Sequence, residues 1–87
     1  MKFSDTLVST IFRYSIGIEE DSGQHYLSFP VSNGMVDYEE HYKIDVESYH
    51  QFLSDTASAV AFADECRDRK RDDLLILKPG RFRGIPS

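Results

Sequence analysis

The dipeptide Asn33-Gly34 constrains this fold more than any other feature, because it separates two β-rich segments, 25–32 (HYLSFPVS) and 35–44 (MVDYEEHYKI). Asn and Gly tolerate the positive φ angles that a type I′ turn needs at both central positions, so the pair predicts a β-hairpin. A two-residue loop would place Val31 opposite Val36 and fix the pairing of all residues further along the strands.

The two faces of this hairpin differ in polarity, because successive side chains of a strand point to opposite faces. The mostly apolar face collects Leu27, Phe29, Val31, Val36, Tyr38 and Tyr42. The mostly polar face includes Tyr26, Asp37, Glu39 and His41. This contrast is typical of an antiparallel sheet that is covered by helices on one side. Glu40 falls on the apolar face, so it must lie near the end of the sheet or have a partner elsewhere.

The remaining segments predict one more strand in the meander, two helices and a final strand. Alternating apolar residues predict a strand over about 10–19, whereas residues 3–9 could instead form a short helix. Asp45 and Asp55 are suited to cap helices over about 46–53 and 56–70. The apolar run 74–77 predicts a buried strand. The expected fold is α+β, of order β-β-β-α-α-β: a three-stranded antiparallel meander plus a short C-terminal strand, with two helices packed on one face.

The hydrophobic pattern also predicts which side chains are buried. The expected core is Phe12, Ile16, Ile18, Leu27, Phe29, Val31, Val36, Tyr38, Phe52, Leu53, Phe62, Leu75 and Leu77. Eighty-seven residues, 40% of them apolar, predict one domain spanning residues 1–87 with a modest core. We expect residues 81–87 to form a loose basic tail.

The chain has no long apolar run, and its N-terminus lacks the pattern of a secretory signal. The single cysteine, Cys66, excludes an intrachain disulfide and suits a reducing compartment. We therefore expect a cytoplasmic protein without membrane contact. At helical spacing with apolar residues, Cys66 is more typical of a buried side chain than of a thiol nucleophile.

Charge is distributed unevenly along the chain. Residues 1–66 carry twelve acidic and three basic side chains, whereas residues 67–87 carry seven basic and three acidic ones. An acidic body suits a basic partner and disfavours the phosphate backbone of nucleic acid. The basic C-terminal segment supports the alternative of a small nucleic-acid-associated regulator.

Asp37, Glu39 and His41 form the sharpest local pattern, because alternate positions of a strand project from the same face. Such a set could begin a metal site or an acid–base pair, so a small enzyme or metal protein is a further alternative. A solvated acidic face is the commoner meaning of the pattern, and no catalytic or phosphate-binding motif accompanies it. We therefore expect no catalytic residue, no metal and no cofactor.

The segments VDYEEHYKI (36–44) and DDLLILKPG (72–80), within a small acidic α+β chain, resemble the immunity proteins encoded beside bacterial polymorphic toxins, including contact-dependent and type VI effectors. The resemblance implies a non-catalytic inhibitor that binds and neutralises a cognate toxin, commonly a basic nuclease.

The polar face of the hairpin and the neighbouring acidic loop form the expected partner-binding surface. Its members are Glu19, Glu20, Asp21, Tyr26, Asp37, Glu39 and His41. Acidic side chains would speed encounter with a basic protein, and Tyr26 would supply an aromatic anchor. An exposed edge strand also makes a homodimer possible.

Overall fold

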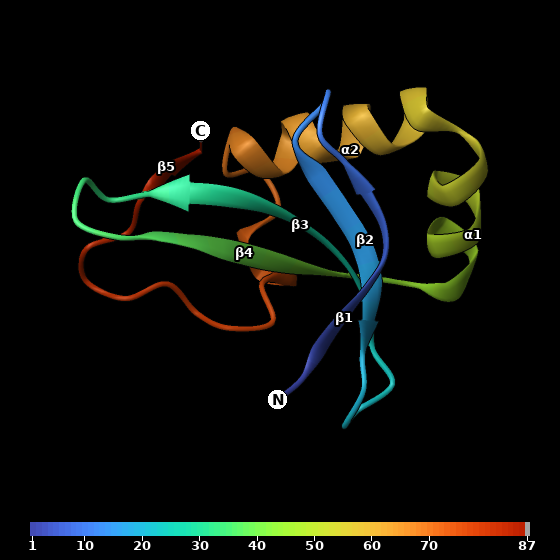
Figure 1. Ribbon diagram of the computed structural model, residues 1–87, viewed down its shortest axis with the longest axis horizontal. Coiled ribbons are helices and arrows are strands. Elements are labelled where there is room, and N and C mark those ends of the chain that lie inside the picture. The colour runs from blue at the N-terminus through green and yellow to red at the C-terminus, as the bar shows by residue number, and fades with distance from the viewer. Residues whose placement is uncertain (87) are drawn as a thin grey trace.

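Four antiparallel strands in chain order form the main sheet in a computed structural model that describes residues 1–86 (Figure 1). They are β1 (Phe3–Ser9), β2 (Tyr14–Glu19), β3 (His25–Ser32) and β4 (Asp37–Ile44). After them come α1 (Val46–Ser54), α2 (Thr56–Arg67), the short 3₁₀ helix η1 (Asp72–Leu74) and β5 (Ile85–Pro86), which pairs with β3. The predicted α+β fold, with two helices and a short C-terminal strand, is confirmed.

The β3–β4 hairpin forms as predicted, but its pairing is shifted by two residues. Val31 pairs with Tyr38 rather than Val36, and the loop spans residues 33–36. Asn33 does not adopt a positive φ; its Oδ1 accepts from the backbone N–H groups of Met35 and Val36 at 2.9 and 3.0 Å. This side-chain turn lengthens the loop. A shift of two residues leaves the predicted faces unchanged, because side chains alternate with a period of two.

Residues 3–9 form a strand, which settles the alternative that the sequence leaves open. β1 pairs with β2, and the pairing register shifts between Asp5 and Leu7. The predicted strand over 10–19 begins only at Tyr14, because residues 10–13 form the turn between β1 and β2. Arg67 holds this turn by donating to the carbonyl oxygens of Phe12 and Arg13 at 3.0 and 2.8 Å.

Both helices begin at the predicted caps. Asp45 accepts from the Ser48 N–H at 2.7 Å, and Asp55 accepts from the Ser58 N–H at 3.3 Å, so each satisfies a backbone donor that the first turn leaves free. α1 contacts β2 and β3, and α2 contacts β3. α2 ends at Arg67, short of the predicted residue 70.

The core lies between the helices and the face of the sheet that they cover. Its most buried predicted members are Ile16, Leu27, Phe29, Val31, Phe52 and Leu75. Ile18, Tyr38, Leu53 and Phe62 are partly buried against this cluster. Three predicted core residues are exposed instead: Phe12 and Val36, because they lie in turns, and Leu77, because it follows η1.

The segment 74–77 is not a strand, so this part of the prediction is wrong. It makes an isolated bridge between Leu75 and Tyr42, and the Ile76 N–H donates to the His41 carbonyl at 3.0 Å. The C-terminal strand is instead Ile85–Pro86. It pairs with the end of β3, at Val31 and Ser32, beyond the residues that pair with β2.

Candidate acidic groove on the open face of the sheet

A groove of about 640 Å³ lies on the face of the sheet opposite the helices. β4 contributes one side of it, with Asp37, Glu39 and His41, whereas the end of β1 and the turn at 10–13 contribute the other. Ser15 of β2 and Pro30 of β3 also line it and come from the strands between these two sides. Asp37, Glu39 and His41, the sharpest local pattern in the sequence, therefore line this groove together.

The two carboxylates of the groove differ in their contacts. Glu39 is exposed and accepts a hydrogen bond from Ser28 Oγ at 3.0 Å. Asp37 is exposed, and its carboxylate has no hydrogen-bond or ion-pair partner among residues 1–86. Because both carboxylates are exposed, both can accept from a cationic group of a partner.

His41 is fixed at the groove by two aromatic neighbours. Its ring stacks on Phe3, with centroids 3.7 Å apart, and meets the edge of Tyr26 at 4.9 Å. Burial lowers the pKa of His41, although the nearby Glu39 and Asp5 carboxylates act in the opposite direction. The lowered pKa disfavours a charged imidazole, so Arg13 is the chief basic side chain among the described residues that line the groove.

Tyr26 lies beneath this surface rather than on it, so the prediction of an exposed aromatic anchor is wrong. Its side chain is fully buried, and its hydroxyl donates to Asp5 Oδ1 at 2.6 Å. Gly17 makes room for the ring, because a Cβ there would overlap both Tyr26 and the Ser4 carbonyl oxygen. Burial and the Asp5 carboxylate raise the pKa of Tyr26 well above its usual value.

Glu19, a member of the predicted acidic surface, is also buried. Its carboxylate organises the loop between β2 and β3. Its carboxylate accepts from the backbone N–H groups of Lys2, Asp21 and Ser22 and from Ser22 Oγ, at 2.8–3.0 Å. These hydrogen bonds lower the pKa of Glu19 to about 2.

The other two loop acids are exposed but paired. Glu20 contacts Lys2 Nζ at 3.4 Å, and Asp21 contacts the N-terminal ammonium at 3.3 Å. Neither lines the groove. The structure therefore brings Asp37, Glu39 and His41 together at one hollow and leaves the loop acids outside it.

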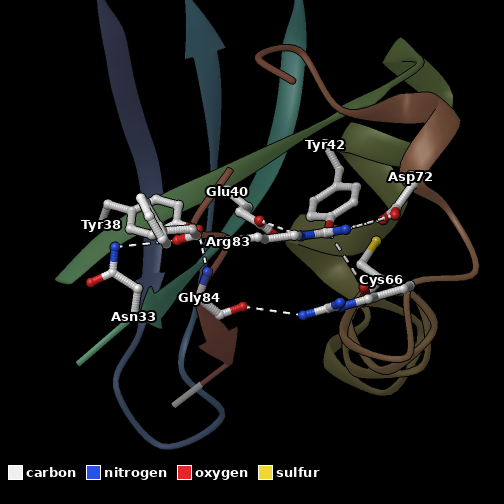
Figure 2. Close-up of polar contacts among 10 residues, drawn as sticks. Asn33, Tyr38, Glu40, Tyr42, Cys66, Asp72, Arg83 and Gly84 are labelled. Carbon is white, nitrogen blue, oxygen red and sulfur yellow. Dashed lines mark hydrogen bonds and ion pairs between the residues drawn. The ribbon is translucent and has the colours of Figure 1, made fainter. Parts of the chain in front are cut away.

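A buried ion-pair network, absent from the predicted site, connects the C-terminal segment to β4 (Figure 2). Arg83 Nε and Nη2 donate to the two carboxylate oxygens of Glu40 at 2.8 and 3.0 Å. The same guanidinium binds Asp72 at 2.7 and 2.9 Å, and Tyr42 donates to Glu40 at 3.0 Å. The position of Glu40 on an apolar face indicated either the end of the sheet or a partner elsewhere, and Arg83 is that partner.

This network also corrects the prediction of a loose tail at 81–87. Arg83 is mostly buried, Gly84 is buried, and the Gly84 N–H donates to the Tyr38 hydroxyl at 2.7 Å. The side chains of Phe82 and Ile85 are exposed. Residue 87 lies outside the described residues.

Other basic side chains near the C-terminus are engaged within the chain. Arg71 pairs with Glu65 at 2.8 Å, and Arg69 donates to the Gly84 carbonyl at 3.3 Å. Together with Arg67 and Arg83, they reduce the positive charge that this segment offers to solvent.

Cys66 is buried in the core, and burial raises the pKa of its thiol to about 12. Within residues 1–86, no group of three or more His, Cys, Asp or Glu side chains is arranged to hold a metal ion. None of the helices in that range has the length and apolar composition needed to cross a membrane. The molecule is thus a small α+β domain with an acidic groove on its open sheet face. Comparison with protein families, curated proteins and solved structures found no match.

Proposed function

We propose that this chain is a non-catalytic binding module, an inhibitor of the immunity-protein type that binds and neutralises a basic toxin in the cytoplasm. One observation carries the proposal: Asp37 and Glu39 are exposed on one side of a groove of about 640 Å³, whose opposite side includes Arg13. A lysine or arginine on a protruding loop of the partner would satisfy both carboxylates.

The electrostatics of the groove support this interpretation. Burial lowers the pKa of His41, so the imidazole offsets the two carboxylates less than an ordinary histidine would, and Arg13 lies on the opposite side of the groove. Negative potential concentrated in a hollow accelerates encounter with a positively charged protein and makes the association rate sensitive to salt. Apolar atoms of Val8 and Pro30 also line the groove and offer contact to the aliphatic part of an inserted basic side chain.

The contacts of the basic and reactive side chains count against the two alternatives, a nucleic-acid-associated regulator and a small enzyme or metal protein. Arg67, Arg71 and Arg83 form ion pairs within the chain, which weakens the case for binding nucleic acid through the C-terminal segment. His41 contacts the rings of Phe3 and Tyr26 rather than a nucleophile, which weakens the case for an enzyme.

The proposal is tested by isolating the partner and measuring inhibition. The protein is used as bait in a lysate of its native host, captured proteins are identified by mass spectrometry, and the chief candidate is purified. We expect a basic protein whose toxic or enzymatic activity falls when this chain is added in equimolar amount. If the candidate binds this chain but keeps its full activity when the chain is in stoichiometric excess, the inhibitor function is rejected.

A charge-reversed pair of variants tests the groove itself. Asp37→Lys with Glu39→Lys should slow association with the purified partner by about tenfold or more at low salt, and less at high salt. The matched control, Glu47→Lys with Asp73→Lys, makes the same change in net charge at exposed acids outside the groove. Equal slowing by both pairs would show that net charge, and not the groove, controls binding.

A further inference from the structure

Large apolar side chains are strongly exposed at the β3–β4 loop and in the C-terminal segment. Met35 is 86% exposed, Val36 58%, Phe82 72% and Ile85 71%. We refer to these four side chains as the tip patch. Single exposed apolar residues are ordinary on protein surfaces, whereas several in adjoining segments mark an interaction surface.

A side-chain hydrogen bond and a strand pairing bring the segments of the tip patch together. Asn33 Nδ2 donates to the Phe82 carbonyl at 3.2 Å, and Ile85 pairs with Ser32 at the end of β3. The β3–β4 loop and the C-terminal segment accordingly lie at the same end of the molecule (Figure 1). The patch is therefore a product of the fold, built from residues almost 50 positions apart.

Opposite charges flank the tip patch. Asp37 follows Val36 in the chain, and Arg81 precedes Phe82. Within residues 1–86, neither side chain forms an ion pair, and the Arg81 guanidinium lies 5.8 Å from the centroid of the Phe82 ring. One copy of the chain thus presents an apolar surface with an unneutralised acid and an unneutralised base beside it.

We propose that the tip patch is the contact surface of a homodimer with two-fold symmetry. In such an interface each surface meets its own copy, so Arg81 of each protomer faces Asp37 of the other while the apolar side chains pack between them. A basic protein fits the tip patch less well than a second copy does, because the exposed Arg81 and Lys78 would repel its positive charge. The patch has four apolar side chains, few beside the roughly 20–30 residues that each partner contributes to a standard interface, so the dimer is weak and reversible.

The apolar part of the proposal is tested by sedimentation equilibrium of the purified chain from micromolar to millimolar concentration. The wild-type protein should shift from monomer to dimer across this range. Phe82→Ser and Met35→Ser should each raise the dissociation constant by about tenfold or more, because both remove an apolar contact at the interface. Ile11→Ser, which changes an 83% exposed residue of the β1–β2 turn, should dimerise as the wild type does.

The proposed ion pair between Arg81 of one protomer and Asp37 of the other is tested by exchanging the two charges. Arg81→Glu should weaken the dimer by repulsion from Asp37 of the other copy, and adding Asp37→Arg should restore the wild-type dissociation constant. A wild-type chain that stays monomeric throughout, patch variants that dimerise normally, or a swap that restores nothing would each overturn the proposal. Because this assay contains only the chain itself, its outcome is independent of whether the groove binds a basic toxin.

Discussion

Arg83 and Glu40 form a bidentate ion pair in the interior, with Nε–Oε2 and Nη2–Oε1 distances of 2.8 and 3.0 Å. The exposed fractions of the two side chains are 13% and 6%. A buried carboxylate that loses its cation keeps its desolvation cost without compensation. The pair therefore holds the C-terminal segment against β4 and allows an acid to occupy an otherwise apolar face.

Replacing Arg83 should destabilise the fold strongly. Arg83→Met leaves Glu40 buried without a cation and should lower the free energy of unfolding by about 3 kcal/mol, measured by urea denaturation. Adding Glu40→Leu to that variant should recover much of the loss, because no buried charge remains. Arg81→Met, at an exposed neighbour, should change stability by less than about 0.5 kcal/mol. A loss under about 1 kcal/mol for Arg83→Met would contradict the network.

Gly17 should tolerate no larger side chain. Gly17→Ala places a methyl group against the Ser4 carbonyl and the Tyr26 ring, which overpacks the sheet and should cost about 1–3 kcal/mol. Gly80→Ala is the matched control, because no heavy atom lies near the position of its added Cβ. Thermal unfolding followed by circular dichroism measures both, and equal melting temperatures would show that Tyr26 does not pack on Gly17.

Phe29 should be the most sensitive aromatic position of the core. It is 1% exposed, stacks on Tyr42 at 5.4 Å between centroids, and carries the Arg67 guanidinium 5.0 Å from its ring. Phe29→Ala should cost roughly 3–5 kcal/mol, a large share of the stability of so small a domain. Phe82→Ala removes an equally large ring from the surface and should change the unfolding free energy little.

Glu19 should make stability depend on pH in the acid range. Its hydrogen bonds lower its pKa from 4.5 to about 2, so the folded state favours the ionised form. Its contribution is complete above pH 4.5 and is lost as the pH falls from there towards 2. The difference in melting temperature between wild type and Glu19→Gln should therefore shrink across this interval. A difference that stays constant with pH would refute the role of the carboxylate.

Cys66 should be unreactive in the folded protein. Burial raises the pKa of its thiol to about 12, so the thiolate that reacts with alkylating agents is scarce at pH 8. Iodoacetamide should modify the native chain far more slowly than the chain in denaturant. Cys66→Ala should also leave partner binding intact in protein that remains folded. Rapid alkylation of native protein would revive a role for the thiol.

The amino-acid pattern predicts the faces of the sheet better than the ends of its elements. Alternation assigned Leu27, Phe29 and Tyr42 to the core side correctly, even though Asn33 lengthened the loop and shifted the pairing. The same alternation could not show that the turn at 10–13 exposes Phe12. Turn length depends on side-chain hydrogen bonds that no hydrophobic pattern records.

The candidate site was predictable only where neighbours in sequence are neighbours in space. Asp37, Glu39 and His41 share a strand face and therefore reach the groove together. Tyr26 was misplaced because β1, through Asp5 and Phe3, covers the part of the polar face on which Tyr26 lies. Arg83 was missed as the partner of Glu40 because 43 residues separate them, and strand alternation shows only that Glu40 lies near the end of the sheet or has a partner elsewhere.

Because Arg83 follows Glu40 by 43 residues, their ion pair cannot form until late in the synthesis of the chain. The ribosome adds about 5–20 residues each second, so Arg83 is synthesised roughly 2–9 s after Glu40. Until then the hairpin can pair but cannot bury Glu40 without the cost of an isolated charge. We therefore expect the packing around Glu40 to be completed only after Arg83 has been synthesised and can neutralise the carboxylate.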